Sequence, residues 1–187
     1  MKRLYLFLTN KDIETIEFEG LFKTLDPEAE FQYENTRMGY FVSEKDCSEE
    51  INTLLASRPR EKALTVVVSH KFWPLEKKLL AEAYGYFPNQ CVYLTDIIMK
   101  ELTFGDFSSI PLLRKEFKEV PSELLETAGS FLRSGLNGLE TAKREGIHRN
   151  TFNYRLNAFI ELTGLDIRDY HNALLLELYF QLAANGR

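Results

Sequence analysis

Hydrophobic residues recur with two different spacings along this 187-residue chain, and the change of spacing divides it into two parts. Short apolar runs typical of buried strands lie at residues 3–9, 63–68 and 91–94. A hairpin with its turn near Asn35 is predicted between the first two runs. The order strand, helix, hairpin, helix, strand, helix, strand predicts an α/β sandwich with a mixed sheet and helices on one or both faces.

Helical spacing of apolar residues appears between these strands. The segment up to Leu25 is predicted to be helical in its second half, and Ser48 is a suitable cap for a helix carrying Ile51 and Leu55. A further helix is predicted from Leu75 to Tyr84, with Pro74 at its start. Residues 96–119 have a weaker pattern that suggests two short helices.

The second part of the chain is predicted to be entirely helical. Val120-Pro121-Ser122 marks a boundary, so we predict one domain over residues 1–119 and another over residues 120–187. The fold class is therefore α+β: an N-terminal α/β sandwich followed by an all-α domain. The last predicted helix, residues 172–184, carries more apolar side chains than one face needs. It either covers the core of its own domain or also forms a dimer interface.

Charge changes this picture locally. The net charge is −5, which is not that of a protein coated for nucleic acid. Between Lys143 and Arg155, however, there are four basic residues and one acid, Glu145. A solvated helix surface would show mixed signs, so this excess indicates a local basic face.

Other chemistry is sparse. The two cysteines form no CxxC motif and fit a cytoplasmic protein, with Cys91 expected in the core and Cys47 exposed. The apolar start of the chain resembles a buried strand more than a signal peptide, and no membrane span is expected. We expect no catalytic constellation, metal site or cofactor. His70, beside Phe72 and Trp73, is either a pocket residue or simply packed.

Residues 142–159 are the most informative stretch. A short predicted helix ends at Glu145, Gly146 can adopt the left-handed conformation of a tight turn, and a second helix begins near His148 or Arg149. Ala142 is small where two helices of such a motif must cross. This pattern is that of a helix-turn-helix that places a recognition helix, about residues 148–162, in the DNA major groove.

The predicted recognition helix has two distinct faces. Its apolar residues are Phe152, Leu156, Phe159 and Ile160. Its other face carries asparagines, a threonine and a tyrosine near two arginines. Asparagine and arginine side chains can pair with base edges, and threonine and tyrosine can donate to phosphates. The predicted DNA-binding residues are Lys143, Arg144, His148, Arg149, Asn150, Thr151, Asn153, Tyr154, Arg155 and Asn157.

The same residues carry a resemblance to a family. Thr141-Ala142, the string Ile147-His148-Arg149-Asn150-Thr151-Phe152 with Tyr154-Arg155-Leu156, and Glu161-Leu162-Thr163-Gly164-Leu165-Asp166 resemble the C-terminal domain of PucR/CdaR-type bacterial transcription regulators. The resemblance covers about residues 122–183 and implies a Fis-like helix-turn-helix. It also implies that residues 149–151, 154 and 155 lie at the DNA interface, with His148 entering the helix.

Some positions depart from the family pattern. The chain has Gly138-Leu139 where members usually carry Leu-Ser or Leu-Thr, Glu145 where an apolar residue is usual, and Ala158 where a basic residue is usual. The upstream region of such regulators often resembles a degenerate GGDEF domain, and residues 1–119 fit that outline loosely. No GGDEF sequence occurs at the hairpin turn, so cyclase chemistry is not expected.

The leading hypothesis is therefore a sequence-specific, DNA-binding transcriptional regulator in the bacterial cytoplasm. Its expected partners are double-stranded DNA, a second copy of the chain in a homodimer, and a small-molecule effector of the N-terminal domain, which would serve sensing or dimerisation. The alternative is a protein-interaction module with a vestigial helix-turn-helix that does not bind DNA. An enzyme has no supporting constellation.

Overall fold

The computed structural model describes residues 2–71 and 74–183 and separates the chain into two compact units. Unit 1 comprises residues 1–106 and unit 2 comprises residues 107–187. The boundary predicted from the sequence, 119/120, lies after this division. The difference arises because the prediction placed α5 (Ile110–Phe117) in the first domain. In the structure Phe117 packs on Tyr179, with 4.4 Å between ring centroids, so α5 is part of the helical unit.

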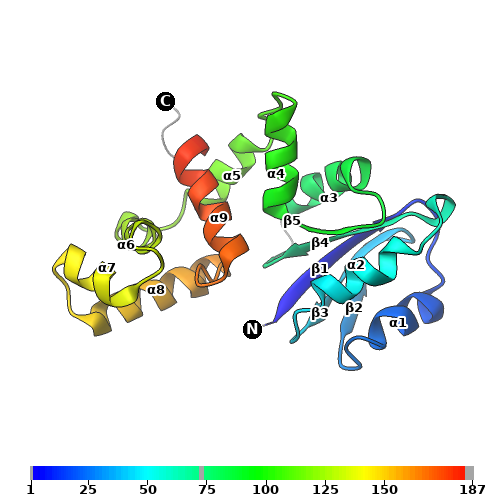
Figure 1. The fold of residues 1–187 in the computed structure, drawn as a ribbon, viewed down its shortest axis with the longest axis horizontal. Coiled ribbons are helices and arrows are strands. Elements are labelled where there is room, and N and C mark those ends of the chain that lie inside the picture. The colour runs from blue at the N-terminus through cyan, green and yellow to red at the C-terminus, as the bar shows by residue number, and fades with distance from the viewer. Residues whose placement is uncertain (1, 72–73, 184–187) are drawn as a thin grey trace. The chain divides into compact units, whose positions relative to one another are not determined.

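Unit 1 is built on a five-stranded mixed sheet with the strand order β2-β3-β1-β4-β5 (Figure 1). The strands are β1 (Arg3–Thr9), β2 (Glu30–Tyr33), β3 (Met38–Ser43), β4 (Leu64–Ser69) and β5 (Cys91–Tyr93). β1 pairs antiparallel with both β3 and β4, whereas β4 and β5 are parallel. The predicted mixed sheet and the hairpin of β2 and β3 are confirmed.

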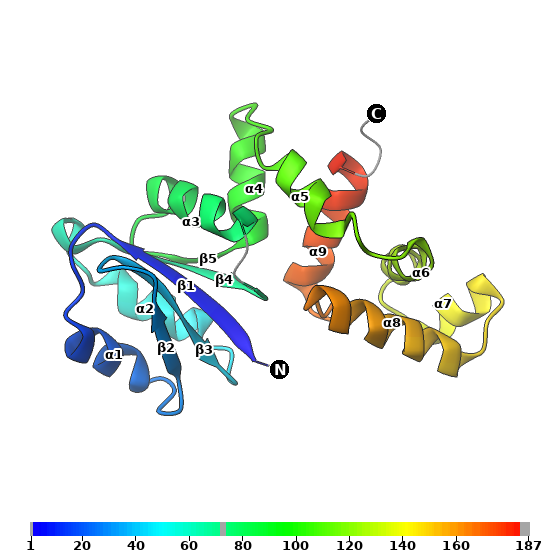
Figure 2. The ribbon, with the colours of Figure 1, turned by 180° about the vertical axis from the view of Figure 1, so that it is seen from behind.

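Helices cover both faces of this sheet, α1 and α2 on one side and α3 on the other (Figures 1 and 2). Their bounds are α1 (Thr15–Lys23), α2 (Ser48–Ala56), α3 (Pro74–Tyr86) and α4 (Leu94–Thr103). Side chains alternate along β1, so Tyr5 and Phe7 enter the core beneath α1 and α2 together with Phe22 and Ile51. The pattern of 96–119 was ambiguous because α4 begins directly after β5, without a turn.

Unit 2 is helical throughout its described part. It contains α5, α6 (Ser122–Arg133), α7 (Gly138–Glu145), α8 (Arg149–Thr163) and α9 (Tyr170–Leu178), which continues as a π-helical segment, Tyr179–Ala183. The predicted α+β fold class is confirmed. Leu175, Leu176 and Leu178 are buried, so much of the apolar surface of the last helix covers its own unit. The predicted helix end, Ala184, lies outside the described residues.

Within the described ranges, the longest helices are too short and too polar to cross a membrane. Several charged residues of unit 1 form ion pairs. The most buried pair joins Lys78 of α3 to Glu101 of α4 at 2.6 Å, and Glu101 is only 1% exposed. This pair connects the two helices that follow β4 and β5.

Candidate nucleic-acid interface

The turn between α7 and α8 has the geometry that the sequence predicted. Asn137 caps α7, its side-chain oxygen accepting hydrogen bonds from the backbone N–H groups of Leu139 and Glu140 at 3.1 and 3.2 Å. Gly146 ends α7 in the left-handed conformation, with φ of 66°. The N–H of Ile147 donates to the carbonyl of Ala142 at 3.0 Å, which closes the helix end. The chain therefore turns sharply into α8.

Close packing fixes how α8 lies against its neighbours. A Cβ atom added to Gly138 would lie 2.5 Å from the Phe152 ring, so a larger residue would require the ring to shift. Phe152 also packs on Phe131 of α6, with 5.4 Å between ring centroids. Ala142 is buried, in agreement with its predicted place at a helix crossing. Packing against Phe152 therefore explains why this chain carries glycine at position 138, where the family pattern has a larger residue.

The start of α8 is capped by His148. Its Nδ1 accepts a hydrogen bond from the N–H of Asn150 at 3.2 Å, so the proton of a neutral imidazole lies on Nε2. His148 itself is exposed. Its Nε2–H is therefore free to donate to an acceptor outside the protein, such as a phosphate oxygen.

The two predicted faces of α8 are both present in the structure. Phe152, Leu156 and Phe159 are buried. The opposite side exposes a polar set of residues, namely Asn150, Thr151, Asn153, Tyr154 and Asn157. Tyr154 is 73% exposed, so both its ring and its hydroxyl are accessible. This polar side of α8 is available to contact base edges.

Cations flank the polar side of α8 near its first turn. Lys143, Arg144 and Arg149 are exposed, as predicted. No ion pair neutralises any of them within the part of the chain that the structure describes. Arg144 donates only to the carbonyl of Arg133, at 3.4 Å. Three uncompensated charges therefore lie beside the N-terminus of α8, where a phosphate backbone would be attracted.

Arg155 occupies a different environment from the other predicted interface residues. Its guanidinium pairs with Glu123 of α6, lies 3.6 Å from a carboxylate oxygen of Glu145 of α7, and donates to the hydroxyl of Thr127 at 3.4 Å. Thr127 in turn donates to Glu145 at 2.9 Å. Arg155 therefore joins α8 to the two preceding helices. The guanidinium that was predicted to meet DNA is already engaged inside the unit.

The sequence did not indicate that Thr127 contributes to this network, nor that Glu145 pairs with Arg155. Thr127 is 1% exposed and bridges partners 18 and 28 residues away in the chain. Such long-range pairs leave no periodic signal. The one available hint was that Glu145 stands where the family usually carries an apolar residue, ten positions before Arg155.

We expect Arg155→Ala to lower the free energy of unfolding of unit 2 by about 1–2 kcal/mol. This value lies between about 0–1 kcal/mol for surface ion pairs and about 3–5 for breaking buried ones, because the network is only partly exposed. Hydrogen exchange of the α8 amides measures the effect. The matched control, Arg149→Ala, should change stability by less than about 0.5 kcal/mol. Unchanged protection in Arg155→Ala would instead favour a direct DNA contact.

The remaining candidate residues lie away from this surface. Cys47 is 4% exposed, so its predicted exposure was wrong: its backbone N–H donates to the hydroxyl of Tyr5 at 2.8 Å, which draws it into the core beneath α2. Cys91 is buried as predicted. His70 follows β4, and burial lowers its pKa to about 3, which keeps it neutral. Its predicted neighbours Phe72 and Trp73 lie outside the described residues.

Both thiols are expected to resist alkylation in the folded protein. Burial raises the pKa of Cys47 and of Cys91, so little thiolate forms near neutral pH and access is blocked as well. Mass spectrometry after iodoacetamide treatment at mildly alkaline pH should find both unmodified, and both modified in denaturant. Rapid modification of Cys47 alone in native buffer would contradict its buried position.

Comparison with known proteins identifies the helical unit. Residues 124–182 match the family of PucR C-terminal helix-turn-helix domains. The chain is 34% identical over 101 residues to the carbohydrate diacid regulator of Escherichia coli, covering 50% of this chain and 26% of that protein. It is 31% identical over 91 residues to the proline-responsive transcriptional activator PutR of Bacillus subtilis, covering 48% and 22%.

A solved structure is similar over more of the chain. The regulator of polyketide synthase expression from Bifidobacterium adolescentis aligns with 97% of this chain and 79% of its own, at 15% identity and a TM-score of 0.49. The chain spans only about a quarter of the length of the curated relatives it matches. Residues 124–182 of this chain form a helix-turn-helix domain of the PucR family.

Proposed function

We propose that this chain is a transcriptional regulator that binds double-stranded DNA through α8. The observation that carries the proposal is the exposed polar side of α8, with Asn150, Asn153 and Tyr154 beside three unneutralised cations. Asparagine amides can pair with adenine edges in the major groove, while the cations contact phosphates. The names of the relatives, a diacid regulator and a transcriptional activator, support the same assignment.

Binding would rely on positioned polar contacts more than on bulk charge. The net charge of the chain is −5, and Arg155 is neutralised by Glu123 and Glu145. Two identical units on paired half-sites about one helical turn apart would double the number of contacts. We therefore propose a homodimer on DNA in the cytoplasm, with unit 1 serving in assembly or in sensing a small molecule. The resemblance of unit 1 to a degenerate GGDEF domain stays a prediction.

A fluorescence anisotropy titration with mixed-sequence duplex DNA at two salt concentrations tests the proposal. Regulator function predicts binding that weakens as salt rises, because phosphate contacts release counterions. Selection of bound duplexes from a random pool should then yield a recurring motif, and sizing on that motif gives the number of copies bound. No binding at low salt would overturn the proposal and favour the alternative, a protein-interaction module with a vestigial helix-turn-helix.

A further inference from the structure

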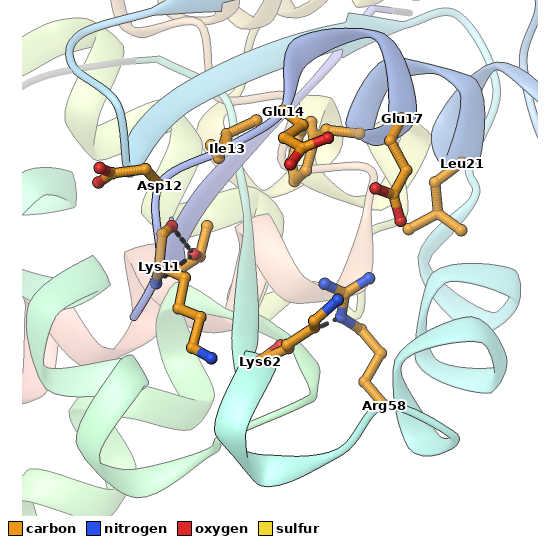
Figure 3. Close-up of a pocket in the computed structure, with 10 residues that line it drawn as sticks. Lys11, Asp12, Ile13, Glu14, Glu17, Leu21, Arg58 and Lys62 are labelled. Carbon is orange, nitrogen blue, oxygen red and sulfur yellow. Dashed lines mark hydrogen bonds between the residues drawn. The ribbon is translucent and has the colours of Figure 1, made fainter.

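A pocket in unit 1 is lined by charged side chains, five of which form no ion pair with any residue that the structure describes. It has a volume of about 220 Å³ and lies between the segment that joins β1 to α1 and the segment after α2 (Figure 3). Lys11, Arg58 and Lys62 contribute three cations, and Glu14 and Glu17 contribute two carboxylates. None of these five side chains takes part in an ion pair with any residue that the structure describes.

Several other charged side chains of unit 1 do form ion pairs, as in Lys23–Glu19 at 2.8 Å and Lys77–Glu34 at 3.1 Å. Even Asp12, at the edge of the pocket, pairs outward with Arg37 at 2.9 Å. The cations and the carboxylates of the pocket therefore face one another across it without forming ion pairs. A ligand carrying both charges would satisfy both sets.

Hydrogen bonds fix the two segments that form the pocket and orient one of its cations. The side-chain amide of Asn10 donates to the carbonyls of Arg60 and Glu61, at 3.4 and 3.2 Å, and its N–H donates to the carbonyl of Ala63. Arg58 Nε donates to the carbonyl of Lys62 at 3.3 Å, which orients the guanidinium (Figure 3). The site is therefore formed before any ligand arrives, which reduces the ordering cost of binding.

The shape and lining of the pocket narrow the class of ligand. Ile13, Phe18 and Leu21 supply an apolar part of the lining, which suits an aliphatic body. In Figure 3, Arg58 and Lys62 extend from one rim while Glu14 and Glu17 project from the other. The volume lies below the roughly 300–1,000 Å³ that is usual for drug-sized ligands, so a nucleotide would be too large.

We propose that this pocket binds a small zwitterionic metabolite with a carboxylate at one end of an aliphatic body and an ammonium group at the other. The carboxylate would meet Arg58 and Lys62, and the ammonium group would meet Glu14 and Glu17. Ligand binding here is independent of DNA binding. Only the idea that the bound ligand regulates unit 2 rests on the proposed function.

Calorimetric titration of the full chain with γ-aminobutyrate, δ-aminovalerate and ε-aminocaproate tests the proposal. At least one should bind saturably below about 10 mM, at least about tenfold more tightly than caproate and hexylamine, which each lack one charge. Arg58→Gln should weaken the zwitterion by about tenfold and make it no better than hexylamine. Glu17→Gln should also weaken the zwitterion by about tenfold, to an affinity no better than that of caproate.

The control variant is Lys23→Gln, which removes a paired cation of unit 1 outside the pocket and should leave ligand affinity unchanged. Absence of saturable binding by all three zwitterions, or equal binding of caproate, would overturn the proposal. A DNA titration on the same samples separates the two claims. Arg58→Gln should bind DNA as the unaltered chain does, and failure of DNA binding would leave the calorimetric result intact.

Discussion

Replacing Lys143 and Arg149 together by alanine is expected to weaken DNA binding by about a hundredfold at low salt, at about tenfold for each charged contact. The slope of log affinity against log salt should become shallower by about two, since each phosphate contact contributes about 0.9. The reason is that both side chains are exposed and unneutralised beside the N-terminus of α8. Anisotropy titrations at several salt concentrations measure both quantities.

The matched control removes two exposed cations from another helix of the same unit. Lys115→Ala with Lys118→Ala changes the net charge equally, yet both residues lie at the end of α5 rather than at the α7–α8 turn. Affinity should change little in this control. An equal loss in both double variants would mean that DNA responds to overall charge, and the assignment of α8 as the recognition helix would fail.

Base contacts should respond differently from phosphate contacts. Asn150→Ala removes an exposed amide without changing charge, so the salt slope should stay the same while discrimination between duplexes falls. A good bidentate contact is worth about 1–3 kcal/mol of discrimination against the wrong base. Competition between a selected duplex and a scrambled one measures that loss. An unchanged ratio would place Asn150 outside the base-reading set.

Phe152→Ala is expected to lower the free energy of unfolding of unit 2 by about 3–5 kcal/mol, as is usual for truncating a buried aromatic. Phe152 is 4% exposed, packs on Phe131 and fills the space left by the absent side chain of Gly138. Since small domains are stable by only about 5–15 kcal/mol, this loss is a large fraction of the total. Hydrogen exchange of the amides of α6 and α8 in the full chain measures it.

Two further variants sharpen this result. Tyr154→Ala, two positions away and 73% exposed, should change stability by less than about 0.5 kcal/mol. Gly138→Ala should destabilise on its own, because its Cβ would meet the Phe152 ring at 2.5 Å, and should cost less beside Phe152→Leu. A loss below about 1 kcal/mol in Phe152→Ala would contradict the packing described above.

Local features were predictable because their causes lie within a few residues. The two faces of α8 follow from a period of 3.6, so Phe152 and Leu156 were assigned to the core without a structure. The turn at Gly146 was predictable because a left-handed residue favours glycine. The apolar run of β4 likewise predicted a strand buried on both faces.

Features that join distant segments were not predictable in this way. The pairing of Arg155 with Glu123 and Glu145 depends on how α6, α7 and α8 dock, and the same guanidinium looks like a DNA contact in sequence. The division between the units differs from the predicted one for a similar reason, since Phe117 packs on Tyr179, more than sixty positions later. Cys47 became buried through a hydrogen bond to β1.

The sequence by itself thus determined the order of elements, the polar and apolar sides of α8, and the family of the helical unit. These depend on residue spacing and short motifs, which are properties of neighbouring residues. Only the tertiary structure decided which cations near α8 form ion pairs with other described residues, and that Lys11 and Arg58 share one pocket. Charge pairing and cavities form where elements meet, and the contacts that decide them are long-range.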